Sequence, residues 1–416
     1  MTVLVAVLAA ALAAPAAPTD AASTGAPAKA PAQAAAAAIP AEGPDAVRAL
    51  FQRELPALAK RRFETPLGIS GQVEAAAAPS VQATANASVL TISLGTGQPI
   101  TCSLFPTRIG VGETLWRIVE AAQKNVKVVA ALPAEVVAVN GSALVLAEVV
   151  YQVESEKGML TGQMKLAALA HPSHSLLCVH DEPGYAATFT RTVKGLAASL
   201  AGGPPDPRAE AVFAELAVMR IGNLPVGYSE RTVGRRKEGG LHSEEYGTQL
   251  LPRGPADLVT LDSASVEESD RGDLLARGVY AHVTNAEIDG RMVLVREADG
   301  KTYRYDGEKD GKALQGTFTT KAGLSTDLWF ARRFAASAPA PKGDVRHEHY
   351  SFTGNPVAAT PVVQRRDASA PRRASLELGP LQVTGELDEH GIFEKAEMPI
   401  GPTKLVIERV WSRGAP

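Results

Sequence analysis

The chain is poor in the residues that mark many catalytic and nucleic-acid-binding proteins. It has two cysteines in 416 residues, 5% aromatic residues, and 42 basic against 45 acidic side chains, which gives a formal net charge of -3. Phosphate binding needs clustered Lys and Arg, so this balance argues against nucleic acid as a partner. The sequence also has no Gly-rich phosphate loop, nucleophile elbow, zinc-protease helix or calcium loop. These absences favour a non-catalytic protein that needs no cofactor.

Apolar runs of bilayer length are absent beyond the start of the chain. Residues 3–14 are apolar, and Ala11-Leu12-Ala13 fits the small-x-small pattern of a signal-peptidase site. Residues 1–20 are therefore expected to be a signal peptide. No Lys or Arg precedes the run and uncharged residues continue to Thr19, so an uncleaved N-terminal anchor is the alternative. The start and the Ala-rich composition predict a periplasmic or secreted bacterial protein with no other transmembrane segment.

Residues 21–43 consist almost entirely of small residues and proline. Such a segment has too few large apolar groups to offset the entropy lost on ordering, so a disordered linker is expected.

Residues 45–200 predict an α+β domain. A helix is expected to begin after Asp45 and to end near the basic run Lys60-Arg61-Arg62, which would complement the helix dipole or contact an acidic lipid head group or partner. Apolar residues then alternate with period two in a hairpin over 89–104 and follow helical spacing over 112–125. Strand patterns at 135–139, 143–153, 159–169 and 174–179 precede a final helix that ends near Leu200. The expected fold is an antiparallel sheet covered by helices.

Two glycines and three prolines at residues 200–208 mark an internal boundary. Beyond it, residues 209–416 show strand-like alternation separated by short Asp-Gly turns. Ten to twelve antiparallel strands are expected, as a large curved sheet, half-barrel or open β-barrel. One helix is predicted where Leu328, Phe330 and Phe334 could cover a mouth of this sheet.

Two stretches resemble known families. Residues 89–200, ending "LLCVHDEPGYAATFTRTVKGLAASL", resemble the PsbP/Mog1-like α-β-α proteins in the order of their elements. Residues 215–411, with "MRIGNLPVGYSERTV" and "LDEHGIFEKAEMPIGPTKLVIERV", resemble the periplasmic LolA/LppX-like half-barrels that carry lipids or lipoproteins, or the β domains associated with transglutaminase-like proteases. The second resemblance implies a curved sheet with an apolar concave face. Neither implies a catalytic residue at a position of this sequence.

Cys102 and Cys178 lie on predicted strands of one domain. In an oxidising compartment, a disulfide is the simplest interpretation of two such cysteines. Two alternatives are a pair of buried thiols and a hydrolase in which His180 activates Cys178, because residues two apart in a strand share a face. Asp181, Glu182 and Pro183 then have the composition of an acidic helix start with proline in the first turn.

Two histidines form the best metal-like pattern. His347 and His349 would project from one face of a strand, and a third ligand could come from His242, His282 or His390, although no spacing rule connects them. Solvated strand residues are the simpler interpretation, so no metal site is predicted. Four arginines in residues 365–373 form either a solvated turn or a basic loop that touches anionic lipid head groups.

These patterns together predict a non-catalytic envelope protein. Its C-terminal curved sheet is expected to bind an apolar ligand, such as a lipid, or an envelope protein partner, because apolar ligands commonly occupy the mouths of β-barrels. The expected inward, ligand-binding positions are Val279, Ala281, Val283, Val293 and Val295. A structural or adaptor protein is the alternative, followed by a hydrolase built on Cys178 or on a histidine-bound metal.

Overall fold

The computed structural model describes residues 48–156, 158–270, 273–284, 289–326, 344–367, 369–379 and 381–415. The expected signal peptide, the linker and the helix with Leu328, Phe330 and Phe334 lie outside the described residues. Within them, antiparallel strands predominate, so the fold is mostly β and the predicted α+β class overstates the helices. No helix among the described residues is long and apolar enough to cross a bilayer.

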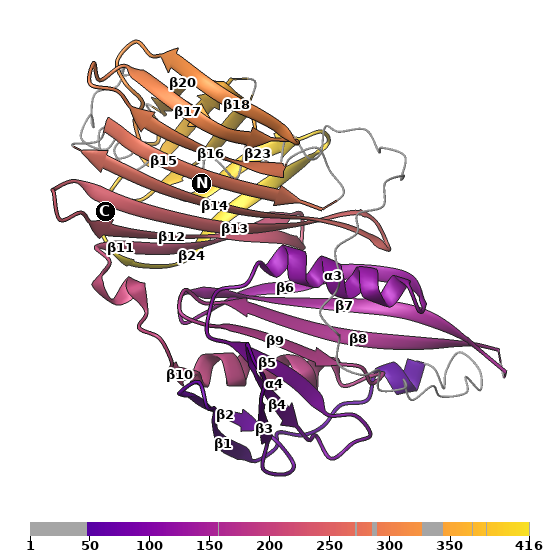
Figure 1. Ribbon diagram of the computed structural model, residues 1–416. Coiled ribbons are helices and arrows are strands. Elements are labelled where there is room, and N and C mark those ends of the chain that lie inside the picture. The colour runs from indigo at the N-terminus through magenta and orange to yellow at the C-terminus, as the bar shows by residue number, and fades with distance from the viewer. Residues whose placement is uncertain are drawn as a thin grey trace.

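The first domain contains two sheets and the helices α3 and α4 (Figure 1). Its elements are β1 (Lys60–Glu64), β2 (Ile69–Glu74), β3 (Ser80–Ala83), β4 (Ser88–Ile92), β5 (Ile100–Phe105), α3 (Val111–Gln123), β6 (Lys127–Val139), β7 (Ser142–Ser155), β8 (Gly158–Ala170), β9 (Ser175–His180), α4 (Ala186–Ser199) and β10 (Ala201–Gly202). Seven strands pair in the order β3-β4-β5-β9-β8-β7-β6, and β1-β2-β10 form a smaller sheet. The predicted hairpin, helices and strands of residues 89–200 are all present.

The small sheet corrects one prediction. Described residues 48–51 are helical, but the helix does not continue to the basic run, because Lys60-Arg61-Arg62 lie in β1 and pair with β2. Pro56 separates the two segments, and proline is incompatible with a helix interior. The three basic side chains are exposed on an edge strand rather than at a helix end.

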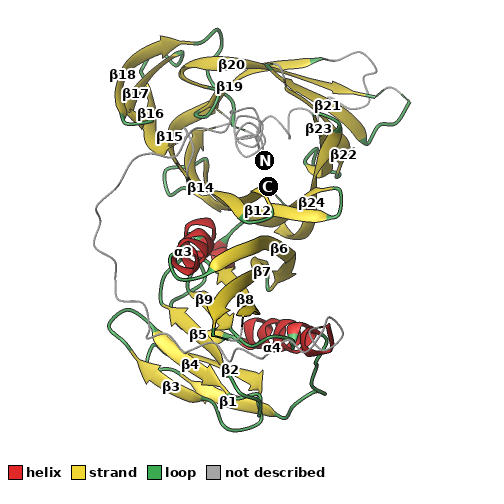
Figure 2. Cartoon of the chain, turned by 90° about the vertical axis from the view of Figure 1, so that its right-hand side faces the viewer, coloured by secondary structure: helices red, strands yellow, loops and turns green. Residues whose placement is uncertain are grey.

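The second domain is a 14-stranded antiparallel sheet that curls into an open barrel (Figure 2). The 3₁₀ helix η1 (Pro207–Glu210) leads into it. Its strands are β11 (Phe213–Ile221), β12 (Leu224–Arg235), β13 (Leu241–Gly254), β14 (Asp257–Asp270), β15 (Asp273–Val283), β16 (Asp289–Arg296), β17 (Thr302–Lys309), β18 (Lys312–Thr319), β19 (Val345–Ser351), β20 (Asn355–Arg366), β21 (Arg373–Leu378), β22 (Leu381–Leu387), β23 (Phe393–Ile400) and β24 (Thr403–Gly414). β24 pairs with β11, which leaves β18 and β19 as the two edges of the sheet.

Side chains close the seam between these two edges. The ring centroid of Phe318 on β18 lies 5.8 Å from that of Tyr303 and 6.4 Å from that of Tyr350 on β19. Residues after β18 also cross the seam, since Ser325 N donates to Glu348 O at 3.2 Å and Leu274 N donates to Leu324 O at 2.9 Å. Aromatic stacking and a short crossing segment therefore complete the ring where no strand ladder joins β18 to β19.

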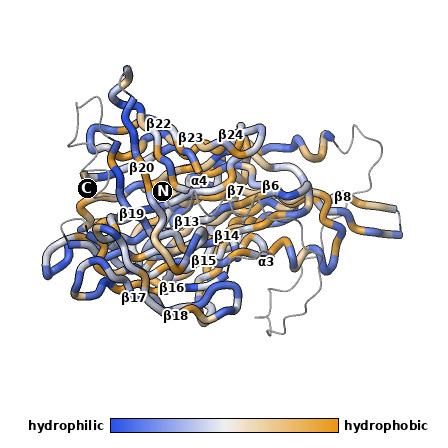
Figure 3. Tube along the Cα trace, turned by 90° about the horizontal axis from the view of Figure 1, so that it is seen from above, coloured by the Kyte–Doolittle hydropathy of each residue, from blue (hydrophilic) through white to orange (hydrophobic). Residues whose placement is uncertain are grey.

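Hydrophobic and hydrophilic residues alternate along the barrel strands, so one face of each strand forms the interior (Figure 3). The interior cluster contains 24 buried apolar residues from strands around the barrel and their connections. A different cluster joins the domains: Leu216, Val218, Tyr228, Leu250 and Leu258 on the outer face of β11–β14 pack with α3 and the large sheet of the first domain. The two domains thus share a continuous apolar core.

Candidate functional site

The predicted inward positions divide into two groups. Val279, Ala281 and Val283 are 5%, 1% and 4% exposed and belong to the interior cluster. Val293 and Val295 are 52% and 37% exposed, so their predicted inward position is wrong. The register explains the difference, because Val279 pairs with Met292, and the inward residues of β16 are therefore Met292 and Leu294.

The side chains of β15 that face the barrel interior form a row, and this row begins with a charged residue. Arg277 is followed on the same face by Val279, Ala281 and Val283, at a spacing of about 6.6 Å between successive inward residues. Arg277 is 2% exposed, and its Nη1 lies 2.9 Å from Glu267 on the neighbouring strand. These residues, with Met292 and Leu294, are called the interior site below.

Arg277 also reaches across the interior. Its Nη1 donates to the backbone oxygen of Tyr350 at 3.4 Å, and its guanidinium carbon lies 5.9 Å from the centre of the Tyr350 ring. Two strands, β16 and β17, separate β15 from the edge strand β18, and Tyr350 lies on the opposite edge strand. The guanidinium therefore lies within the barrel, close to the seam.

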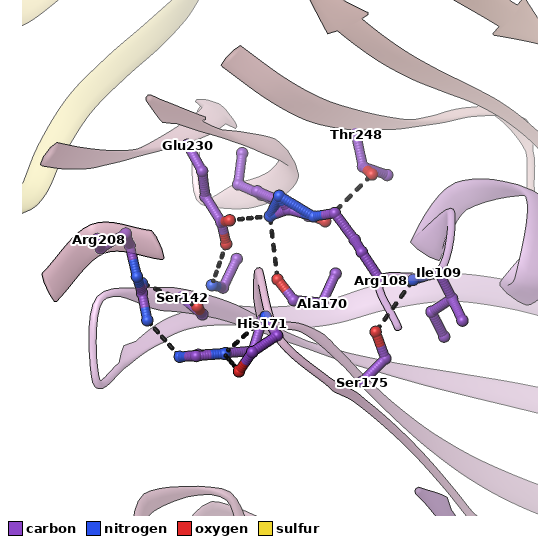
Figure 4. A network of polar contacts seen from close by, with 12 residues as sticks. Arg108, Ile109, Ser142, Ala170, His171, Ser175, Arg208, Glu230 and Thr248 are labelled. Atoms are coloured by element: carbon purple, nitrogen blue, oxygen red, sulfur yellow. Dashed lines mark hydrogen bonds and ion pairs between the residues drawn. The ribbon is translucent and has the colours of Figure 1, made fainter. Parts of the chain in front are cut away.

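A second buried polar group lies where the two domains meet (Figure 4). Arg108 forms an ion pair with Glu230 of β12 and donates to Ala170 O at 3.1 Å, while Ala143 N donates to Glu230 Oε1 at 2.9 Å. Burial raises the pKa of Glu230 above its usual value, and the Arg108 charge opposes that rise. The pair therefore links the domains with a charge of each sign, both largely removed from water.

The barrel also caps a helix of the first domain. Asp262 on β14 accepts hydrogen bonds from Gly112 N at 3.0 Å and Glu113 N at 2.7 Å, at the start of α3. A Cβ atom at Gly110 or Gly112 would lie 2.8 or 2.9 Å from the Asp262 carboxylate, so the close approach requires glycine at both positions. A cavity of about 290 Å³ lies beside this contact, between Arg108 and the outer-face tyrosines Tyr228, Tyr246 and Tyr280.

The same junction contains a serine, a histidine and an aspartate in contact. Ser173 Oγ lies 2.9 Å from His171 Nδ1, and His171 Nε2 lies 3.3 Å from Asp206 Oδ2. The arrangement lacks a usable base, because burial and the Arg208 charge lower the pKa of His171 to about 3. Ser173 is itself buried, and Arg208 binds Asp206 through three nitrogen–oxygen contacts. The group positions η1 rather than activating a nucleophile.

The cysteine predictions are resolved by the structure. Cys102 and Cys178 pair across β5 and β9 and form a disulfide, so Cys178 cannot act as a nucleophile with His180. His180 is fully buried, stacks on Phe189 with ring centroids 6.2 Å apart, and lies 3.9 Å from Glu182. Burial, with the charge of Lys165 as a smaller cause, lowers the pKa of His180 to about 4.

The predicted acidic cap of α4 is wrong. The helix begins only after Tyr185, and its first amides are bound by a distant carboxylate: Ala187 N and Thr188 N donate to Glu54 at 2.8 and 2.7 Å. Asp181 instead accepts from the Tyr151 hydroxyl at 2.5 Å. Glu182 accepts from Thr96 Oγ1 and Gln98 N, which ties the loop to the turn between β4 and β5.

The structure does not bring the five predicted histidines together. His347 and His349 lie on the inward side of β19, whereas His242, His282 and His390 each contact a separate carboxylate. No group of three or more histidine, cysteine or acidic side chains that could hold a metal occurs among the described residues. In the basic segment, Arg365 pairs with Glu377 and Asp344, and Arg372 pairs with Glu394.

Comparisons with known proteins identify no family. No family model and no curated protein matches the chain. A solved structure, the beta-barrel-like protein of a domain of unknown function, DUF1849, from Brucella abortus, is similar at a TM-score of 0.38 and 10% identity. The match covers 50% of this chain and 98% of that one.

Proposed function

We propose that the protein is a non-catalytic binding protein of the bacterial envelope, periplasmic or secreted, whose barrel interior binds an apolar ligand such as a lipid. The observation that carries the proposal is the contiguous apolar cluster on the inner face of a 14-stranded barrel. About eight strands enclose an interior that lining side chains alone can fill. A ring of 14 strands encloses more space, and on the β14–β15 wall the inward side chains of Ser263, Ser265 and Ala281 are small.

Two tryptophan variants test this proposal. Ala281→Trp adds volume inside the barrel, whereas Val293→Trp adds the same indole to the exposed outer face of the neighbouring strand. We expect the wild-type protein to release lipid on solvent extraction and to carry bound mass in native mass spectrometry. The Ala281→Trp variant should lose this mass and the Val293→Trp variant should retain it, with circular dichroism confirming that both are folded. Repeated absence of bound mass, together with no binding of an added solvatochromic fatty-acyl probe, would reject the proposal.

Binding of an envelope protein partner is a second candidate function, and strand β1 favours it. β1 is an edge strand, and the exposed Lys60, Arg61 and Arg62 make no ion pair among the described residues. A cavity of about 580 Å³ adjoins it, lined by Arg62, Phe63, Ser70, Gln72 and Ser199, among others. An acidic extended segment could add to this edge and find complementary charge. Exchange of all three basic residues for Glu should abolish retention of such a partner from envelope extracts, and unchanged retention would exclude this edge.

A further inference from the structure

The interior site contains a buried cation, Arg277, with a hydrogen-bond donor that has no acceptor among the described residues. Nη1 of Arg277 binds Glu267 and the Tyr350 carbonyl. Nε is buried and has no acceptor in the part of the chain that the structure describes. A buried donor without an acceptor is energetically unfavourable, so Nε favours any acceptor that enters the site.

The chemistry of the Nε edge of the guanidinium is specific. Nε–H and one Nη–H of an arginine point in the same direction, and together they match the two oxygens of a carboxylate or phosphate. Glu267 is bound at the other side of the guanidinium, so it neutralises charge without occupying the Nε edge. Lysine in the same place would supply charge but not the planar pair of donors.

Apolar side chains extend from Arg277 along β15 and the neighbouring strand β16. Val279, Ala281 and Val283 continue the inward row of β15 away from Arg277, over about 20 Å of strand. Met292 and Leu294 flank the row on β16, and both are fully buried. A linear ligand that lies along this row with its head at Arg277 places an acidic group on the Nε edge and its chain against apolar side chains.

From this geometry we propose that the interior site selects amphipathic ligands with an anionic oxygen head group, and that Arg277 is the residue that distinguishes them from neutral ones. The inference rests on the proposed apolar-ligand function. It goes further by stating the chemical class of the ligand.

The experiment compares two probes of equal chain length, hexadecanoate and hexadecanol, by displacement of a fluorescent fatty-acyl reporter from delipidated full-length protein. We expect hexadecanoate to bind about 10- to 100-fold more tightly, the range for charge-assisted hydrogen bonds in a buried site. Arg277→Met should remove most of that preference and leave hexadecanol binding intact. Arg277→Lys should retain only part of it, and Arg291→Met, on the exposed outer face of β16, should behave as wild type.

The outcomes separate the two proposals. If both probes bind the wild-type protein equally, selection by Arg277 is wrong while apolar-ligand binding stands. If neither binds, the proposed function and the inference that rests on it both fail. The comparison on the wild-type protein remains decisive even if Arg277→Met does not fold. A preference for hexadecanoate that persists in folded Arg277→Met would also overturn the assignment, because another group would then supply it.

Discussion

The buried His180 makes the stability of the protein depend on pH, and the size of the effect follows from its surroundings. His180 is fully buried against Phe189, and burial lowers its pKa from 6.5 to about 4. The unfolded chain therefore takes up a proton below pH 6.5, whereas the folded protein does not until about pH 4. The contribution of His180 to stability is complete above pH 6.5 and decreases as the pH falls toward 4. The total change corresponds to about 3 kcal/mol.

Replacement of His180 by Phe tests this reasoning. Phenylalanine keeps the aromatic contact with Phe189 and cannot take up a proton in either state. We expect wild-type unfolding free energies, measured by urea titration, to fall between pH 7.5 and pH 4.5 by about 2 to 3 kcal/mol more than those of the variant. The matched control is His242→Phe, at a partly exposed histidine on β13 that contacts Glu244, and it should keep the wild-type pH dependence. Equal pH dependence in wild type and His180→Phe would refute the argument.

Three further predictions concern stability. Replacement of Cys102 and Cys178 by Ala should lower the free energy of unfolding by about 4 kcal/mol. In the unreduced wild-type protein, no thiol should react with a labelling reagent. A thiol that does react would contradict the disulfide. Glu230→Ala leaves Arg108 buried without its ion-pair partner, so it should lower the free energy of unfolding, measured with urea, by about 3 to 5 kcal/mol. The control Glu113→Ala breaks an exposed pair with Arg117 and should lower it by less than about 1 kcal/mol. Tyr303→Phe removes a hydroxyl that donates to Leu274 O and accepts from Leu324 N, so it should cost about 1 to 3 kcal/mol, whereas the exposed Tyr280→Phe should be neutral.

Local patterns were enough to predict the strands but not always their inner face. The alternation in Val279, Ala281 and Val283 places apolar residues on one face only, and that face is the buried one. In Met292-Val293-Leu294-Val295 every residue is apolar, so period two gives no preference for either face. Pairing with β15 decides between them, and pairing depends on a register that a single strand does not contain.

Contacts between distant parts of the chain explain the remaining errors. Asp181, Glu182 and Pro183 have a composition typical of a helix start, yet α4 is capped by Glu54, more than 130 residues away. The ion pair between Arg108 and Glu230 and the cap that Asp262 provides to α3 also span more than 100 residues. Each of these residues is unremarkable in its local sequence, so only the folded arrangement reveals its role. The disulfide could be predicted because cysteine is scarce and its chemistry admits few partners.

The first domain holds the barrel on one side only. This difference determines where the barrel would open for a ligand at the lowest cost in free energy. The outer face of β11–β14 is fixed to the first domain by a shared apolar core, the Arg108–Glu230 pair and the Asp262 cap. The seam between β18 and β19 has no strand ladder, and it is closed by stacked rings and by the segment at Leu324 and Ser325. Among the described residues, separating these two strands would break no strand ladder, whereas separating any two neighbours elsewhere in the sheet would break one. Arg277 contacts Tyr350 at this same seam, so the residue proposed to recognise the ligand head group lies at the position where the barrel is most easily opened.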